Sequence, residues 1–273
     1  MTTATIKPGI APAAELHPGS LTFGEAVNFL NAHEHSPHLL AVETFFLKRL
    51  MEDLEPEEKA ECYYYLLRCR LKKSRLFETV DSVELYKKMR AAFAKAEKEL
   101  LTAARRGRSR VARAQLAAFY RLAIFHFGSL ENIYRAQNFE DSMRQAYEDK
   151  MDLRRRSFRF DGHYASWLGY LLTGTTSRYG NSFVRWGLTT LLSLVGFVLV
   201  YASIDAASVP EMRIIPLDGS FFKYFYYTIV TFTTLGYGDL HPHTMPQMAA
   251  VCVEVLVGYF MLGVLINLLN RRM

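Results

Sequence analysis

The stretch Thr233-Thr234-Leu235-Gly236-Tyr237-Gly238-Asp239 decides the fold, because an apolar segment lies on each side of it. Gly236 and Gly238 can adopt backbone angles that a side chain would forbid, so successive carbonyl groups can all point at one axis. A row of such carbonyls can replace the water around a dehydrated cation. Thr234 adds a hydroxyl at the inner end of this row, and Tyr237 can support the loop from behind.

This stretch resembles the filter signature of potassium channels, and its setting resembles the bacterial two-transmembrane members of that family. The resemblance covers about residues 183–270 and implies an all-α pore. It implies ion-binding positions at Thr234, Leu235, Gly236, Tyr237 and Gly238, with K⁺ held at the first four. Leu235 stands where the family most often has valine. Since the backbone carbonyl meets the ion, we expect selectivity to survive this difference.

The resemblance also implies which residues support the filter: Thr233, Tyr226, Tyr227 and Asp239. The two tyrosines fall where the family often carries aromatic residues that hold the width of the filter. Val230 falls where some relatives place an acid that pairs with the counterpart of Asp239. That pairing is therefore not expected here.

Two apolar runs, at about 183–202 and 246–269, are long enough to cross a bilayer as helices. The segment at 221–232 is apolar but too short to cross, so it is predicted to enter from outside and stop at mid-membrane, with Ser220 or Asp218 capping its start. One chain supplies one such loop, so a homotetramer is predicted. Arginines flank both runs on their far sides, which places both termini in the cytoplasm by the positive-inside rule.

Three residues of the second apolar run are candidates for function. Glu254 is ionisable inside a membrane span, where such groups are costly and usually functional. We expect it to support the filter by bonding to the pore helix or to a neighbour behind the filter. Gly258 has the spacing of the gating-hinge glycine in similar channels, and Gly263 is a rival hinge. Close helix packing is the alternative explanation for Gly258.

The first half of the chain is predicted to be helical throughout. Apolar residues recur at helical spacing from Ala60 to Leu71 and from Leu85 to Leu100, and further helices are predicted at 111–135 and 140–155. Pro56 with flanking acids is typical of a helix start. The predicted organisation is a flexible tail at 1–20, a helical cytoplasmic domain at 21–160, an interfacial helix and linker at 161–182, and a pore domain at 183–273 with its filter at 234–239.

The interfacial helix is predicted at Tyr164–Leu172, where Trp and Tyr follow a basic cluster. The cluster consists of Arg154, Arg155, Arg156 and Arg159, for which anionic lipid headgroups are the expected partners. A last buried helix of the soluble domain is the alternative. The segment Gly174–Gly180 is predicted to link this helix to the first span, which Asn181 or Ser182 can cap.

Other charged and polar clusters favour ordinary surface roles. The net charge of +6 is spread along helical segments, so the arginines at 105–113 are predicted to be a solvated helix junction and no nucleic acid is expected. The histidines at 33–38 are predicted to lie at a solvated helix end rather than in a metal site. Cys62, Cys69 and Cys252 lack zinc spacing and are typical of reduced thiols.

No phosphate loop, catalytic triad order or paired-carboxylate motif occurs, so neither an enzyme nor a cofactor is expected, and K⁺ is the permeant ion. The prediction is a potassium-selective channel of a bacterial inner membrane, gated through the N-terminal domain, which could bind an unknown regulatory ligand or protein. No voltage-sensor pattern precedes the pore and no sensing domain follows it. The alternatives are a less selective cation channel, or a membrane-anchored helical scaffold with a vestigial pore.

Overall fold

The structure is a computed structural model that describes residues 21–32, 39–73, 80–107, 110–216 and 220–270. Every regular element in these ranges is a helix, so the predicted all-α class is confirmed. The chain divides into two compact units, Met1–Ser157 and Phe158–Met273. The predicted tail, the histidines at 33–38, Arg108, Asp218 and the last two arginines lie outside the described residues.

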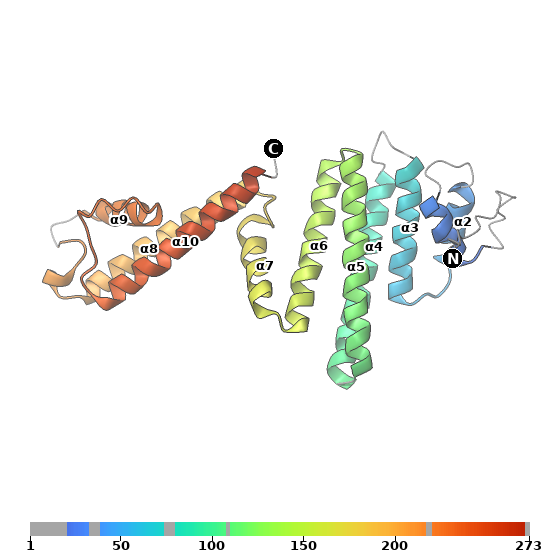
Figure 1. Ribbon diagram of the computed structural model, residues 1–273, viewed down its shortest axis with the longest axis horizontal. Coiled ribbons are helices and arrows are strands. Elements are labelled where there is room, and N and C mark those ends of the chain that lie inside the picture. The colour runs from blue at the N-terminus through green and yellow to red at the C-terminus, as the bar shows by residue number, and fades with distance from the viewer. Residues whose placement is uncertain (1–20, 33–38, 74–79, 108–109, 217–219, 271–273) are drawn as a thin grey trace, which may run out of the picture. The chain divides into compact units, whose positions relative to one another are not determined.

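The N-terminal unit is built from α1 (Phe23–Ala32), α2 (Leu39–Arg49), α3 (Pro56–Lys73), α4 (Val80–Gly107), α5 (Arg110–Ala136) and most of α6 (Glu140–Asp161). The longer helices α3 to α6 run beside one another (Figure 1). Their facing sides bury a core rich in aromatic rings, among them Tyr64, Phe119 and Phe127, and Phe46 of α2 is buried as well. Burying such large side chains is the main source of stability for a helical domain of this kind.

Buried polar groups in the N-terminal unit are held by specific partners. The Tyr120 hydroxyl donates to Glu97 at 2.9 Å, and Arg156 forms an ion pair with the same carboxylate. Arg156 is predicted to lie near lipid headgroups; its guanidinium is paired with Glu97 and its side chain is still 45% exposed. This pairing was not visible in the sequence because 59 residues separate the two partners.

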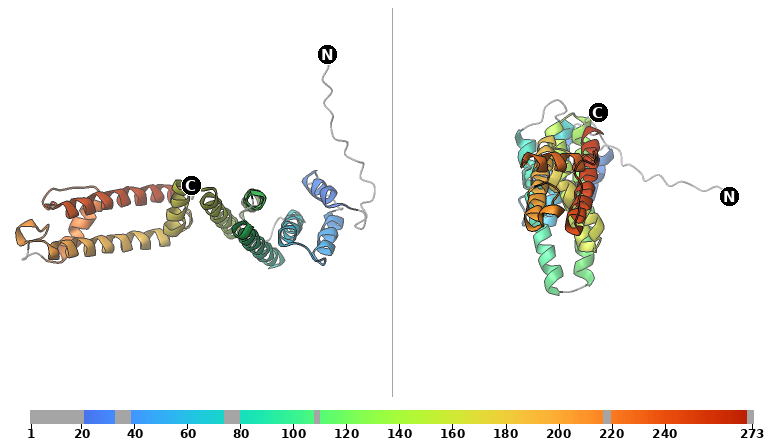
Figure 2. Two further views of the ribbon diagram at one scale, coloured as in Figure 1. Left: turned by 90° about the horizontal axis from the view of Figure 1, so that it is seen from below. Right: turned by 90° about the vertical axis from the view of Figure 1, so that its left-hand side faces the viewer.

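The C-terminal unit contains α7 (Tyr164–Ser177), α8 (Phe183–Ala207), the short 3₁₀ helix η1 (Pro210–Met212), α9 (Phe222–Phe232) and α10 (Met245–Asn270). Helices α8 and α10 lie alongside each other, and α9 packs against both (Figure 2). Helix α8 continues beyond the predicted end of the first span to Ala207. Helix α7 continues through Ser177, so the first part of the predicted linker is helical.

Helices α8 and α10 are long and apolar enough to cross a membrane, with 25 and 26 residues. About half of their large apolar side chains are exposed in the single chain, including Leu188, Leu192, Leu199, Leu256 and Leu262. A soluble protein would bury such extended apolar faces, whereas lipid or neighbouring subunits can cover them in a membrane. The exposure therefore favours two spans over two core helices of a soluble fold.

Candidate ion-conduction site

The short helix α9 delivers the chain to the filter stretch. Phe221, and not the predicted Ser220, is its N-cap residue, and the Ser220 hydroxyl accepts a hydrogen bond from the Phe222 amide at 3.3 Å just before the helix. At the other end, the Leu235 amide donates to the Val230 carbonyl at 2.9 Å and the Thr234 amide to the Thr231 carbonyl at 3.0 Å. These bonds close the last turn and start the filter backbone in a defined direction.

The filter backbone alternates between two conformations. Thr234, Gly236 and Gly238 have positive φ angles of 57°, 57° and 79°, whereas Leu235 and Tyr237 between them do not. A left-handed residue at every second position turns successive carbonyls toward one side, which an ordinary strand does not do. Thr234 is β-branched, so its left-handed conformation is costly and is typical of a functional position.

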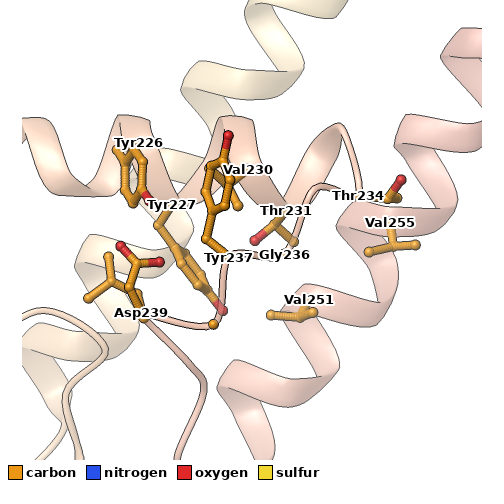
Figure 3. A pocket seen from close by; sticks show the side chains of 12 residues that line it. Tyr226, Tyr227, Val230, Thr231, Thr234, Gly236, Tyr237, Asp239, Val251 and Val255 are labelled. Atoms are coloured by element: carbon orange, nitrogen blue, oxygen red, sulfur yellow. The ribbon is translucent and has the colours of Figure 1, made fainter.

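The side chains behind this backbone brace the filter (Figure 3). The ring of Tyr226 on α9 stacks on that of Tyr237, with centroids 6.4 Å apart and planes 6° apart. The Tyr226 side chain also lies beside the Asp239 carboxylate (Figure 3). Val230 supplies no acid to pair with Asp239, as predicted. Tyr226, on the same helix as Val230, is the polar residue beside Asp239 instead.

A cavity of about 230 Å³ lies between the filter, α9 and α10. Val230, Thr231, Val251 and Val255 form part of its wall (Figure 3). Tyr227 also lines this cavity, but its ring packs against Tyr201 of α8, with centroids 5.0 Å apart. The two predicted filter-supporting tyrosines therefore differ: Tyr226 contacts the filter, and Tyr227 connects the pore helix to the first span.

A buried carboxylate at the C-terminal end of α8 is hydrogen-bonded to the surrounding segments. Asp205 is fully buried and accepts hydrogen bonds from the amides of Ile214 and Ile215 at 3.2 and 3.0 Å. It also accepts from Tyr224 of α9 at 3.2 Å and from Gln247 of α10 at 2.9 Å. Asp205 and these four partners, here called the outer clamp, connect the ends of α8, α9 and α10.

The outer clamp was missed in the sequence. Asp205 follows a long apolar run and is the only acid in α8. An acid at the end of a membrane span is a signal that could have drawn attention to it, because burial there requires several donors. Its partners come from three separate segments, so no spacing rule identifies them.

Glu254 has a different partner from the predicted one. Its carboxylate is fully buried and accepts a hydrogen bond from the Tyr201 hydroxyl at 2.5 Å. Tyr201 lies on α8, so the expected bond to the pore helix or to a neighbour behind the filter is corrected to a bond between the two spans. Through the contact of Tyr201 with Tyr227, the carboxylate reaches the pore helix only indirectly.

The two candidate hinge glycines have different surroundings. A Cβ atom at Gly258 would lie 2.3 Å from the carbonyl oxygen of Phe232, the last residue of α9. Nothing lies within 4 Å of a Cβ at Gly263. Gly258 therefore allows close approach of the pore helix, which was the alternative explanation, and the assignment of a hinge stays a prediction for both.

This segment of the chain is similar to known proteins. Residues 187–273 match the family model described as "Ion channel". This segment is similar to the pore region that the family model describes. The family resemblance predicted from the filter stretch is thereby confirmed, and the matched segment contains α9, the filter and α10, together with most of α8. The match and the two apolar helices also agree with a membrane location.

The relatives found among well-studied proteins are potassium channels. The A-type voltage-gated potassium channel KCND3 of human, rat and mouse is 38% identical to this chain over 78 residues. The match covers 29% of this chain and 10% of each relative, so the chain spans about a tenth of their length. No solved structure gives a significant match.

Proposed function

We propose that the chain forms a potassium-selective channel. The observation that carries this proposal is the alternating left-handed backbone at Thr234, Gly236 and Gly238, which directly follows a pore helix too short to cross the membrane. Carbonyls turned to one side can replace the hydration shell of K⁺. The C-terminal end of α9 carries partial negative charge and favours a cation nearby.

We propose a homotetramer as the conducting form. In the single chain the filter residues from Thr233 to Asp239 are exposed, with Leu235 and Tyr237 at 60% and 68%. Irregular backbone at membrane depth is tolerated only where protein or a water-filled cavity surrounds it. A ring of four loops supplies both, because each filter then faces a shared axis and each back is covered by its own α9.

The orientation and surroundings of the channel follow from its charges. Both termini are proposed to lie in the cytoplasm of a bacterial cell, with the chain in the inner membrane. Helix α7 exposes Tyr164, Leu168 and Leu172 at spacings of one helical turn, and the Arg159 guanidinium lies 5.7 Å from the Trp167 ring. This arrangement suits a helix lying at the headgroup level, with Arg154 and Arg159 near anionic lipids.

The N-terminal unit is proposed to gate the pore. It is a compact helical domain joined through α7 to the first span, so any movement of its last helix reaches α8 along the chain. A regulatory ligand or protein bound to this domain could bias such a movement. No nucleic acid is proposed as a partner.

The test is ion flux through purified protein in liposomes, with either K⁺ or Na⁺ as the permeant ion. We expect K⁺ flux that largely excludes Na⁺ and that stops in Gly236→Ala, because alanine strains a left-handed position. Gly196→Ala is the matched control, since Gly196 lies within α8 and has open space around it. Equal fluxes of the two ions would contradict selectivity and favour a less selective cation channel, with Leu235 as the first position to examine. Absence of flux under all conditions would favour a scaffold.

A further inference from the structure

The turn between α7 and α8 has an unusual backbone. Arg178, Tyr179 and Gly180 follow one another in the left-handed region, with φ angles of 50°, 57° and 84°. Residues other than glycine adopt this region at a cost, and two in succession are rare. Such strain persists only where the surrounding structure holds it.

Several contacts hold this turn in place. Ser177 is buried, and its carbonyl accepts from the amides of Asn181 and Ser182 at 2.9 and 3.0 Å. Its hydroxyl accepts from the Gly180 amide at 3.0 Å. The Tyr179 ring packs over Gly174, where a Cβ atom would lie 2.8 Å from it. The segment predicted as a linker is therefore a stiff elbow, defined here as residues 177–182.

The elbow leads directly to a bond between the two spans. Ser182 caps α8 by accepting from the Arg185 amide at 3.2 Å. In the same first turn, the indole nitrogen of Trp186 donates to the Met261 carbonyl of α10 at 3.0 Å. Helix α7 contacts both α8 and α10, so the three elements form one packed corner.

Helix α10 makes three close contacts with neighbouring helices between Glu254 and Met261. Glu254 is bonded to Tyr201 of α8, Gly258 lies against the Phe232 carbonyl of α9, and Met261 is bonded to Trp186. Gly263 comes two residues after the last of these three contacts and has open space around it, and the next buried residues of α10 are Val264 and Leu268. Gly263 is the first position after these contacts where a glycine permits bending.

We propose that the elbow and Trp186 form a stiff linkage through which α7 displaces the inner helix α10 at Met261, so that α10 bends at Gly263 rather than at Gly258. Trp186 is a positioning residue, because it acts on the pore through the inner helix. The proposal rests on the proposed function, in which the N-terminal domain gates the channel. It adds the route by which that movement reaches the pore.

The contact itself can be tested without any current. The chain has two tryptophans, Trp167 and Trp186, so the full-length protein in lipid nanodiscs gives two indole N–H resonances after ¹⁵N labelling. We expect the Trp186 proton to exchange with solvent at least about tenfold more slowly than that of Trp167, because it is hydrogen-bonded. Tyr179→Gly, which keeps the left-handed angle but removes the ring from Gly174, should accelerate exchange at Trp186 and leave Trp167 unchanged. Equal exchange at Trp186 with and without the Tyr179 ring would overturn the linkage.

The role in gating is tested by open probability in planar bilayers. We expect Trp186→Phe and Tyr179→Gly each to shift it several-fold in the same direction, and the double variant to shift it no further than the larger single effect, since residues acting in series are not additive. Thr189→Ala is the control, because its hydroxyl bonds to the Arg185 carbonyl within α8. Additive effects, or no effect, would overturn the proposal. If the unmodified channel carries no current, the proposed function fails, and the exchange measurement still decides whether the linkage exists.

Discussion

At the scale of single residues, Gly258 shows how a missing side chain can determine helix packing. The end of the pore helix approaches α10 so closely that the space normally taken by a Cβ atom holds the Phe232 carbonyl. Backbone cannot move aside as a flexible side chain can. The position of the pore helix, and with it the start of the filter, therefore depends on this glycine.

Gly258→Ala should therefore destabilise the pore. Overpacking at such a contact typically costs about 1–3 kcal/mol, and alanine's better helix propensity recovers only about 1 kcal/mol of it. We expect a lower thermal unfolding midpoint of the detergent-solubilised protein and a weaker K⁺ flux. Gly263→Ala is the matched control for stability and should leave the midpoint unchanged or slightly raised. A midpoint unchanged in Gly258→Ala would contradict the packing role.

His126 gives the N-terminal unit a dependence on pH. It is 1% exposed and its ring lies 4.0 Å from that of Tyr64. Burial lowers the pKa of His126 from 6.5 to about 4, and the positive charge of Arg68 acts in the same direction. The unfolded chain therefore binds more protons than the folded unit between these two values, so stability falls as the pH drops through this window.

His126→Phe should remove this dependence. Between about pH 7 and about pH 5 the unmodified unit should lose roughly 2 kcal/mol of unfolding free energy through His126, whereas the variant should not. Denaturant unfolding followed by circular dichroism at both pH values measures the difference. Exposed His163 supplies the control substitution, His163→Phe, which should keep the unmodified slope. Identical slopes in all three proteins would show that His126 does not titrate with unfolding.

At the scale of elements, the outer clamp explains how three helices end in register around the filter. Asp205 accepts hydrogen bonds from two backbone amides and from the side chains of Tyr224 and Gln247. The side-chain oxygen of Gln247 in turn accepts from the amides of His243 and Thr244 at 2.7 and 2.9 Å. A buried network is favourable when its members are satisfied and costly when one is removed. The loops around η1 and before α10 therefore depend on one carboxylate.

Asp205→Ala should disrupt assembly of the pore domain. It leaves buried donors without an acceptor, each of which costs about 1–3 kcal/mol. We expect loss of the folded oligomer on size-exclusion chromatography, or a strongly reduced yield of it. Glu211→Ala removes an exposed acid from η1 nearby and should behave as the unmodified protein does. Normal assembly of Asp205→Ala would mean that the loops are held by other contacts.

At the scale of the whole molecule, the two units divide the work of the proposed channel. Residues 158–273 contain the spans, the filter and their braces, and residues 1–157 form a separate helical unit. The pore unit leaves its apolar faces and its filter exposed in a single chain, which requires lipid and further copies around it. Selectivity is expected to depend on the second unit, and control of opening on the first.

Removal of residues 1–157 should therefore separate conduction from control. We expect the shortened protein to keep its preference for K⁺ over Na⁺ in liposome flux, because the filter and its braces are retained. Its open probability in planar bilayers should differ from that of the full chain by several-fold. The control is the intact protein, with chains of 31.3 kDa, reconstituted in the same way. Unaltered opening under every stimulus would contradict gating through the N-terminal unit.

The sequence by itself determined the class of the protein and the place of its filter. The stretch from Thr233 to Asp239 and the two apolar runs are local features, because glycine spacing and the length of an apolar segment can be read without knowing any neighbour. Helical periodicity is also local, so the all-α class followed from it. The resemblance that the family-model match at residues 187–273 supports was recognisable from the same features.

Only the tertiary structure decided which residues meet. Glu254 is hydrogen-bonded to Tyr201, Asp205 to Gln247, and Trp186 to Met261. The partners are 53, 42 and 75 residues apart in the sequence. The packing of Gly258 against the pore helix and the stiffness of the elbow were likewise invisible in the chain. These features depend on how the helices are placed in space, and periodicity within one helix carries no information about the face of another that it will contact.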